Sequence, residues 1–550
     1  MPVSDTAVPT SALSARSKLL IALGYLLAWI LLAGPLFLRM PLTNDTEVYD
    51  LQAAAYRTGS VLYRDFLEPN LPGVIWIHLA VRGVLGDSSE AMRLFDLAVF
   101  ALTATLAGRL VRQAGGDVTV RVGTAFAMAA YYLTASEWCH CQRDVWMLCP
   151  ALAAVSFRLN GLNTARIDRR FIRSFCEGML WGTAVWLKPH VMIPAAMVWG
   201  VSLRYLTDRR TIACDAVGLL TGGLLIGALG IGWMMQVGCW EPFLDTMREW
   251  NPAYFRAGRE HWTITRFVGM SLRQGPWLLF PAVGLIIALR LIWMRVGNPA
   301  TDGNRGHAAV EMLAALFIGW LAQALFLQHL FDYVFAPTVL LAIILTTAAL
   351  APMPSFPEMA LRLGLGFAVC LVWASPALRP ARLSCWGDCW RRELSPRQRD
   401  ALAHFPNPDR ENLARVAAFL REANVTDCDV CFYNSDFVSL YRQLELRPPV
   451  RYTYFFETLQ FFPQKRRELL AELQQSAPRF VVTDLVSVGM PLRDAEAVGP
   501  DGPQAPPPAY RRAPKDVYPW SCPVVYRAGT YLVHRVPDRV AERSSHEPRP

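Results

Sequence analysis

The chain has 550 residues, of which 53% are hydrophobic and only 18% are charged, and its net charge is +9. Soluble proteins of this length carry about 25% charged residues, so the composition excludes an ordinary soluble fold. The sequence contains no basic stripe interleaved with aromatic residues, so nucleic acid is not an expected partner.

Apolar runs dominate residues 19–375, and charges are dense only between these runs and in the last third of the chain. A helix needs about 20 mainly apolar residues to cross a bilayer. The predicted fold class is an α-helical polytopic membrane protein with about eleven transmembrane helices, followed by a C-terminal α/β domain. The predicted helices lie near residues 19–38, 91–111, 118–135, 145–160, 174–188, 190–203, 213–235, 267–290, 309–327, 334–351 and 360–376.

Basic residues indicate the orientation of these helices. Cytoplasmic segments carry an excess of Lys and Arg, so residues 1–18 are predicted to be a cytoplasmic tail. No small-x-small cleavage site follows the first apolar run, which is therefore expected to be retained. An odd number of crossings places residues 377–550 outside the cytoplasm, and the expected localisation is the inner (cytoplasmic) membrane. The basic residues of the predicted cytoplasmic segments are Arg109, Arg112, Arg121, Arg166, Arg169, Arg170, Arg173, Arg204, Arg209, Arg210, Arg290, Arg295 and Arg305.

The first external segment, residues 39–90, begins with a polar stretch at 43–50 that holds three carboxylates. Asn44 with Glu47 three residues later is typical of a capping box, so these polar groups could serve only to begin a helix over residues 46–57. The apolar residues of this helix share one face, which suits an element lying on the membrane surface: Val48, Leu51 and Ala55.

The rest of this segment is predicted to fold at the membrane boundary. Residues 62–73 contain two prolines and a glycine and are expected to form an irregular loop. Residues 74–85 are apolar but short, so they predict an interfacial or re-entrant helix that carries His78 and Arg82. Residues 86–89 are expected to cap the next transmembrane helix.

Short motifs follow one another through this segment: Asp45-x-Glu47, Tyr49, Gly59, Tyr63-Arg64-Asp65, Pro72-Gly73, Leu85-Gly86 and Arg93-Leu94. Their order resembles that in the membrane-integral glycosyltransferases of the C-type fold (GT-C). The closest similarity is to the bacterial relatives of protein O-mannosyltransferases and lipid A aminoarabinose transferases. The resemblance covers residues 15–380 in layout. Those enzymes take a sugar from a polyprenyl-phosphate carrier on the outer face of the membrane.

The resemblance implies that Asp45 is the catalytic base, because an early acidic residue of the first external loop has this role in the family. Glycosyl transfer to a hydroxyl needs a carboxylate that accepts the hydroxyl proton. The departing lipid phosphate needs cations that neutralise its charge. A direct displacement of this kind inverts the anomeric centre, and Glu47, Tyr63 and Arg64 are expected to bind substrate.

A second polar segment, residues 136–144, ends in Gln142-Arg143-Asp144 and is predicted to lie on the same face of the membrane as Asp45. It resembles the second acidic site of the family, which implies that Asp144 orients the acceptor or the carrier phosphate and that Arg143 pairs with this phosphate. The alternative is a polar loop whose Arg-Asp pair only caps the next helix.

Lys188-Pro189-His190 interrupts an apolar region. Charged residues within a membrane are costly and are therefore functional candidates. The resemblance implies that Lys188 binds the carrier phosphate, and His190 is a further substrate-binding candidate. The alternative is a lysine that extends to the interface beside a proline break.

Two later segments could also contact substrate. Residues 236–266 combine Arg256 and Arg259 with several aromatic residues, which could hold a lipid phosphate and a sugar, although interfacial aromatic belts have the same composition. Residues 328–333 resemble an aromatic, histidine-bearing family segment, but Asp332-Tyr333 stands where a Tyr-His pair is expected.

The cysteines do not indicate a metal site. Cys139 and Cys141 flank His140, but the usual zinc pattern needs a second ligand pair, which this region lacks. We therefore expect no cofactor and find no indication of a divalent metal. An oxidising compartment would permit disulfides among the later cysteines, whose pairing stays open: Cys385, Cys389, Cys428 and Cys431.

Residues 377–550 are more polar and predict a small α/β domain outside the membrane, similar to the soluble C-terminal domains of these transferases. Strands are expected at 429–433 and 479–483, helices at 410–423 and 464–475, a hairpin at 526–534 and a proline-rich excursion at 498–516.

The expected function is that of an inverting glycosyltransferase at the outer face of the cytoplasmic membrane. Its expected partners are a polyprenyl-phosphate-linked sugar donor, membrane lipids and a hydroxyl acceptor on a protein, lipid or glycan. A surface-glycan ligase or polymerase, and a transporter of lipid-linked sugars, are the alternatives. The sequence shows no P-loop or Gly-x-Ser-x-Gly motif, so an ATP-driven mechanism is not supported.

Overall fold

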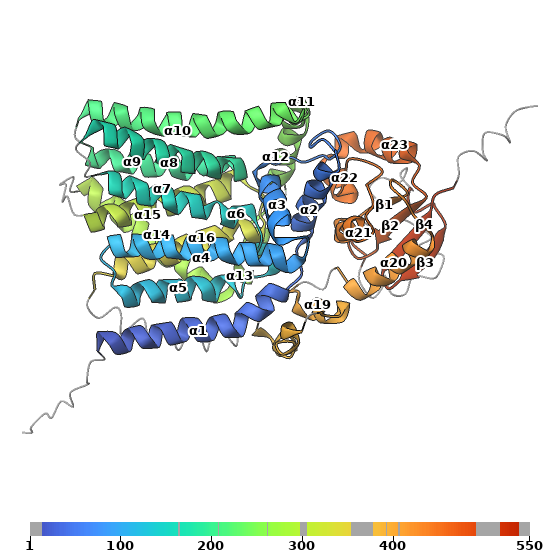
Figure 1. The fold of residues 1–550 in the computed structure, drawn as a ribbon, viewed down its shortest axis with the longest axis horizontal. Coiled ribbons are helices and arrows are strands. Elements are labelled where there is room, and N and C mark those ends of the chain that lie inside the picture. The colour runs from blue at the N-terminus through green and yellow to red at the C-terminus, as the bar shows by residue number, and fades with distance from the viewer. Residues whose placement is uncertain are drawn as a thin grey trace, which may run out of the picture.

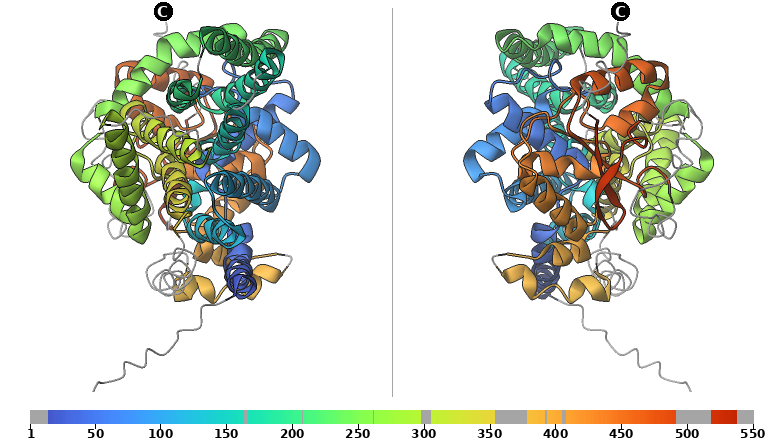
Figure 2. Two further views of the ribbon diagram at one scale, coloured as in Figure 1. Left: turned by 90° about the vertical axis from the view of Figure 1, so that its left-hand side faces the viewer. Right: turned by 90° about the vertical axis from the view of Figure 1, so that its right-hand side faces the viewer.

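The computed structural model describes residues 14–162, 166–206, 208–260, 262–297, 305–353, 378–391, 393–404, 408–490 and 518–537. Most of the described helices lie side by side in one bundle, and a smaller sheet-containing region covers one end of it (Figure 1). Figure 2 views the bundle along its helix axes. The bundle contains α1 (Ala15–Arg39), α4 (Ser89–Gln113), α5 (Val118–Tyr132), α7 (Leu148–Gly161), α8 (Ile167–Leu187), α9 (Met192–Ser202), α10 (Arg209–Gln236), α14 (Leu279–Gly297), α15 (Arg305–Leu327) and α16 (Asp332–Leu350).

Six helical segments among the described residues are long and apolar enough to cross a membrane: Ala15–Arg39, Ser89–Gln113, Arg209–Gln236, Gly275–Met294, Arg305–Leu327 and Asp332–Leu350. The chain is thus largely helical and has several helices suited to a membrane, as predicted. The predicted spans at 118–135, 145–160, 174–188 and 190–203 coincide with α5, α7, α8 and α9, which are shorter or carry more charge. The predicted span at 360–376 lies outside the described residues.

Two predicted boundaries differ from the structure. The apolar span expected at 267–290 begins only at Gly275, because α13 (Ile264–Arg273) is a separate amphipathic helix at the end of the bundle. The helix expected at 46–57 is α2 (Asn44–Arg57). Its N-cap is Thr43, whose hydroxyl accepts a hydrogen bond from Thr46 N at 3.4 Å, so Asn44 is not the capping residue.

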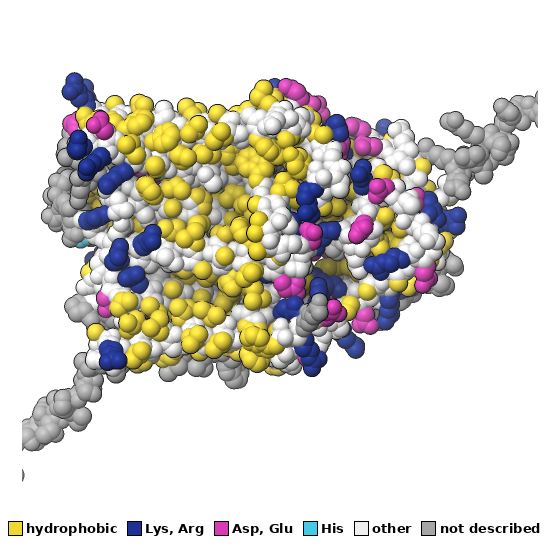
Figure 3. All heavy atoms as spheres, in the orientation of Figure 1, with side chains coloured by type: hydrophobic (Ala, Val, Ile, Leu, Met, Phe, Trp, Pro, Cys, Tyr) yellow, Lys and Arg dark blue, Asp and Glu magenta, His cyan; other side chains and the backbone are white. Residues whose placement is uncertain are grey.

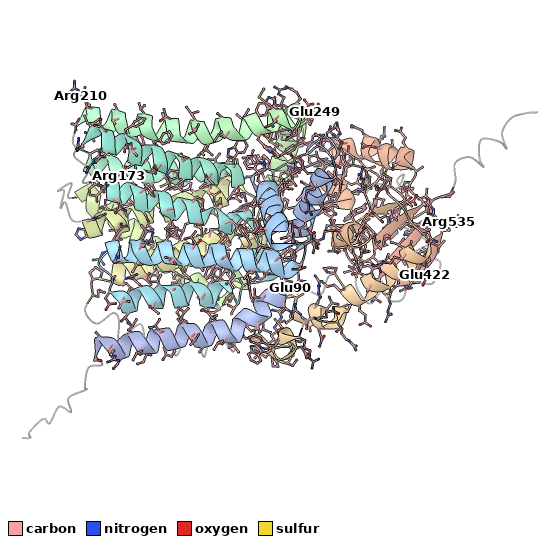
Figure 4. The ribbon with its side chains drawn as sticks, in the orientation of Figure 1. Glu90, Arg173, Arg210, Glu249, Glu422 and Arg535 are labelled. Carbon is pink, nitrogen blue, oxygen red and sulfur yellow. The ribbon has the colours of Figure 1, made fainter. Side chains whose placement is uncertain are left out.

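The surface of the bundle divides into three zones. Hydrophobic side chains cover its middle as a broad band, and Lys and Arg gather at the end far from the sheet (Figure 3). Arg173 and Arg210 lie at this basic end, whereas Glu90 and Glu249 lie at the opposite end, beside the sheet-containing region (Figure 4). An apolar band between two polar ends matches the profile of a bilayer.

Helices α8 and α10 pack with their backbones in contact. A Cβ atom added to Gly178 would lie 2.1 Å from the carbonyl oxygen of Leu219, and one added to Gly222 would lie 2.0 Å from that of Phe175. Small residues allow helices to approach this closely in a membrane, where van der Waals packing stabilises their association.

Helix α2 and α3 (Gly73–Leu85) lie across the end of the bundle that faces the sheet (Figure 1). A buried ion network joins them. Asp50 accepts hydrogen bonds from His78 Nδ1 at 2.6 Å and from Arg82 Nε at 2.8 Å, and its side chain is fully buried. The short apolar helix predicted at 74–85 is therefore confirmed, and its two polar residues hold α2 in place.

The C-terminal region, residues 378–537 as far as they are described, contains a four-stranded sheet in the order β1-β2-β4-β3. Strands β1 (Val430–Phe432) and β2 (Phe480–Asp484) are parallel, and the hairpin β3 (Val524–Ala528) and β4 (Tyr531–Arg535) adds antiparallel pairing. Its helices include α19 (Pro396–Leu402), α20 (Arg410–Glu422), α21 (Val438–Gln443), α22 (Phe455–Phe461) and α23 (Arg466–Ser476). The predicted strands, helices and hairpin of this region are confirmed, while the excursion at 498–516 lies outside the described residues.

The C-terminal region is docked on α2. Val48, Leu51 and Ala55 are buried in one hydrophobic cluster with the helices and strands of this region, including Leu413 and Phe432. The interpretation of this face of α2 as a membrane-surface contact is therefore wrong, because an amphipathic pattern does not distinguish lipid from a protein partner. Arg442 of α21 adds an ion pair to Asp50 at 2.6 Å.

We predict that Gly222→Ala lowers the thermal stability of the detergent-purified protein, because the added methyl group collides with the backbone of α8. Gly227→Ala, on the same helix, is the matched control, since a Cβ there meets nothing within 4 Å. Alanine stabilises a helix by about 1 kcal/mol relative to glycine, so the control substitution should leave the melting temperature unchanged or raise it. Equal melting temperatures for the two variants would contradict the close packing.

Candidate functional site

Asp45 lies in the first turn of α2, where the bundle meets the C-terminal region. Its Oδ1 accepts a hydrogen bond from the hydroxyl of Tyr454, a residue of the C-terminal region, at 3.2 Å. Burial raises the pKa of the Asp45 carboxyl, whereas the Arg143 guanidinium and the hydrogen bond from Tyr454 oppose this shift. The site thus holds a carboxylate whose affinity for a proton is increased by desolvation.

Arg143 is the first residue of α6 (Arg143–Trp146) and is only 8% exposed. Its guanidinium interacts electrostatically with Tyr49, Asp144 and Glu68. Burial opposes its charged form, yet these groups keep its pKa above the ordinary value. Within the described part of the chain, however, the guanidinium has no hydrogen bond and no ion pair. Its N–H groups can therefore donate hydrogen bonds to an anionic ligand.

Lys188 lies in the break between α8 and the short helix η2 (Pro189–Val191). Its Nζ donates to Asp144 Oδ1 at 2.7 Å and to the side-chain oxygen of Gln328. The same ammonium lies 5.9 Å from the ring centre of Tyr333, a cation–π distance. Asp144 is fully buried, and its Oδ2 has no hydrogen-bond partner among the described residues. Lys188 therefore neutralises Asp144 and leaves one carboxylate oxygen free to accept a proton or a hydroxyl donor.

Glu68 is a second buried carboxylate near Arg143. It accepts hydrogen bonds from Gln52 Nε2 at 3.0 Å and from the backbone N–H of Asn70 at 3.0 Å. Burial raises the pKa of Glu68, and Arg143 opposes this shift. Tyr63 is held in the same loop, where its hydroxyl donates to the Asn70 carbonyl at 2.7 Å. These bonds order the irregular loop that was predicted at 62–73.

Aromatic rings form a further wall of the site. Tyr254 of α12 (Asn251–Glu260) stacks on His329 with ring centres 4.3 Å apart. Tyr254 also interacts electrostatically with Arg143 and Asp45. His190 is partly buried near Lys188, and its Nδ1 has no hydrogen-bond partner within the described ranges. Planar rings beside polar groups are suited to binding a sugar.

The structure thus brings together six of the sequence-predicted residues: Asp45, Tyr63, Arg143, Asp144, Lys188 and His190. It places the other four elsewhere. Glu47 pairs with Arg442 at 3.4 Å, and Arg64 is exposed and pairs with Asp65 at 2.7 Å. Arg256 is exposed, and Arg259 donates to the Leu325 carbonyl at 3.1 Å. The recorded contacts of these four residues do not join them to Asp45.

No group of His, Cys, Asp and Glu within the described ranges is arranged to hold a metal ion. Cys139 and Cys141 are buried, and His140 Nε2 lies 2.6 Å from the Tyr132 carbonyl oxygen. Every cysteine that the structure describes is a free thiol, including Cys385, Cys389, Cys428 and Cys431. The contact of His140 holds the segment 136–141 against the end of α5.

Several residues of the site did not stand out in the sequence: Gln52, Glu68, Gln328 and Tyr454. The position of Glu68, a carboxylate in the proline-containing loop after Asp45, could have indicated a site residue. Tyr454 gave no such indication, because it lies 409 positions from its partner Asp45. Only the docking of the C-terminal region on α2 brings the two together.

Comparison of the sequence with models of known protein families and with curated proteins finds no match.

We predict that Asp144→Asn lowers the thermal stability of the purified protein, because the Lys188 ammonium would stay buried without its counterion. Breaking a buried ion pair costs about 3–5 kcal/mol. The double variant Asp144→Asn/Lys188→Met should recover most of this loss, since neither charge then remains. Additive losses in this double-mutant cycle, measured by thermal denaturation, would show that the two side chains do not interact.

Proposed function

We propose that the protein is an inverting glycosyltransferase that moves a sugar from a polyprenyl-phosphate carrier to a hydroxyl group of a protein, lipid or glycan. The observation that carries the proposal is the electrostatic proximity of Asp45, a partly buried carboxylate, to Arg143, whose guanidinium makes no hydrogen bond or ion pair with a described residue. One group accepts a proton and the other receives an anion, which are the two requirements of such a transfer.

In the proposed reaction, Asp45 accepts the proton of the acceptor hydroxyl while the hydroxyl oxygen forms a bond to the anomeric carbon. The bond from this carbon to the carrier phosphate breaks on the opposite side, and its electrons leave with the phosphate. Arg143 neutralises the phosphate, and a charge-assisted bidentate contact suits this pair of groups. The anomeric centre is inverted because a single displacement occurs.

Lys188 and Asp144 have supporting roles in the proposal. Lys188 adds positive charge beside Arg143 but is balanced by Asp144 at 2.7 Å. Asp144 still has one oxygen without a hydrogen bond within the described structure, so it can orient the acceptor hydroxyl or a sugar hydroxyl. The positive charge available to the carrier phosphate is therefore concentrated on Arg143.

The proposed orientation follows from the basic end of the bundle. Cytoplasmic ends are enriched in Lys and Arg, so we place Arg173 and Arg210 in the cytoplasm and Asp45 at the outer face. We further propose that about eleven helices cross the membrane, with a cytoplasmic N-terminus and an extracytoplasmic C-terminal α/β domain. The polyprenyl chain would then lie in the bilayer with its phosphate at the level of Arg143.

A transporter of lipid-linked sugars is favoured by one observation. Arg158, Glu177 and Asp215 form a buried ion network between α7, α8 and α10, with an Nε–Oε2 distance of 2.8 Å between the first two. Charged groups inside a membrane bundle are frequent in transport pathways. A ligase or polymerase of surface glycans would differ from the proposed enzyme only in its acceptor.

We predict that Asp45→Asn abolishes sugar transfer while the protein remains folded and inserted in the membrane, because an amide cannot accept the hydroxyl proton. The measurement is the amount of radiolabelled sugar incorporated into membranes when each of a panel of polyprenyl-phosphate sugars is supplied as the donor. Loss of a general base lowers the rate by about 10²–10⁴-fold.

Asp245→Asn is the matched control, because Asp245 is exposed on α11 (Trp240–Asp245) at the same end of the bundle. This variant should transfer sugar at the wild-type rate. An unchanged rate of sugar transfer in Asp45→Asn would show that Asp45 is not the catalytic base. Sugar translocation without covalent transfer would support the transporter instead.

We predict that transfer by the wild-type protein is lost as pH falls through the pKa of Asp45, because the base must be unprotonated. Burial raises this pKa, so the loss begins at a higher pH than for an ordinary aspartate. Tyr454→Phe removes a hydrogen bond that lowers the pKa of Asp45 and should move the midpoint upward by about half to one pH unit. A pH–rate profile that is identical in the two proteins would contradict this role of Tyr454.

A further inference from the structure

A cleft with a volume of about 660 Å³ lies between the bundle and the C-terminal region, on α2 but away from Arg143. Its walls come from the segment between α1 and α2, one side of α2, the start of α4, and α19, α20 and α21. Pockets for small ligands span about 300–1,000 Å³, so the cleft can hold a ligand of several sugar rings. None of the residues assigned to the transfer reaction lines it.

The charged lining of this cleft is rich in hydrogen-bonding groups. Arg57 pairs with Asp87 at 3.0 Å, and Arg442 pairs with Glu47 at 3.4 Å. Each of these pairs presents both donors and acceptors to the cleft. A ligand with many hydroxyl groups needs this mixture, because every hydroxyl both donates and accepts a hydrogen bond.

Arg399 is a cation of the cleft that has no counterion among the described residues. Arg399 of α19 is half-buried, and its side chain makes no hydrogen bond or ion pair with any described residue. The first residues of two longer helices, Ser89 of α4 and Arg410 of α20, also line the cleft. The positive ends of both helices already hold acidic side chains, Glu90 in α4 and the N-cap Asp409 in α20. Arg399 therefore provides the position for one acidic group among the hydroxyl-binding pairs of the cleft.

We propose that this cleft binds an acidic oligosaccharide, with its carboxylate or phosphate at Arg399 and its hydroxyl groups at the Arg–carboxylate pairs. Asn44 and Glu47 line the cleft, and Asp45 lies between them in the first turn of α2. A glycan held here reaches Asp45 by passing this turn. That the bound glycan is the acceptor rests on the proposed transferase function, whereas the binding itself does not.

The test is binding of trigalacturonic acid, with maltotriose as the neutral trisaccharide, to the full-length protein in nanodiscs of phosphatidylcholine. We expect trigalacturonic acid to bind and maltotriose to bind at least tenfold more weakly. Arg399→Gln should weaken trigalacturonic acid binding about tenfold, the effect of losing one charged hydrogen bond. Since the Arg399 side chain makes no hydrogen bond or ion pair within the described ranges, we expect this substitution to leave the fold intact.

Arg397→Gln is the matched control, since Arg397 lies on the same helix, is 88% exposed and does not line the cleft. Its binding should equal that of the wild type. Equal loss in both variants, or equal binding of the two trisaccharides, would overturn the proposal. Competition by phosphatidylglycerol added to the nanodiscs would assign the cleft to a lipid head group and also overturn it.

The sugar-transfer assay separates this inference from the proposed function. The protein could bind trigalacturonic acid in a manner that depends on Arg399 and yet show no transferase activity. This result would support the binding site and contradict the proposed transferase function. Sugar transfer could instead depend on Asp45 and be unaffected by Arg399→Gln when the acidic acceptor is below saturation. This result would overturn the inference that the acceptor binds in the cleft.

Discussion

The ion pairs of the buried Asp50 carboxylate hold together the end of the bundle that contacts the C-terminal region. This carboxylate is fully buried and receives His78 and Arg82 from α3 and Arg442 from the C-terminal region. A buried carboxylate is stable only when its lone pairs are satisfied, so α2, α3 and α21 must adopt one relative arrangement. That arrangement places Asp45, which lies five residues before Asp50 on the same helix, against Tyr454 and near Arg143.

The charges of this end divide into two groups by their pairing. Arg82 and Arg442 both pair with Asp50, and these ion pairs hold the parts of the structure together. Arg143 is buried without such a partner among the described residues, and Asp144 has one oxygen without a hydrogen bond. Satisfied polar groups rigidify a fold, whereas a buried polar group without a partner can serve in catalysis or hold a water molecule or an ion. This difference in pairing is the physical basis of the proposed site.

Apolar length and the spacing of turns were enough to predict much of the fold. The long helices, the short helix with His78 and Arg82, and the strand, helix and hairpin positions of the C-terminal region all follow from local patterns. The resemblance-based choice of Asp45, Arg143, Asp144 and Lys188 identified side chains that lie together. Glu47 and Arg64 are close to Asp45 in sequence but face other partners, because the direction of a side chain depends on its helix and on what docks against it. Tyr454 and the partner of the apolar face of α2 could not be predicted, since both depend on contacts between distant parts of the chain.

The hydrogen bond from Tyr454 to Asp45 has a consequence for biogenesis. A ribosome completes every long apolar helix of the described bundle before it reaches the residues that dock on α2. Until those residues have emerged and folded, Val48 and Leu51 stay uncovered and Asp45 lacks its tyrosine neighbour. The proposed site is therefore complete only after the C-terminal region has been synthesised and has folded onto α2.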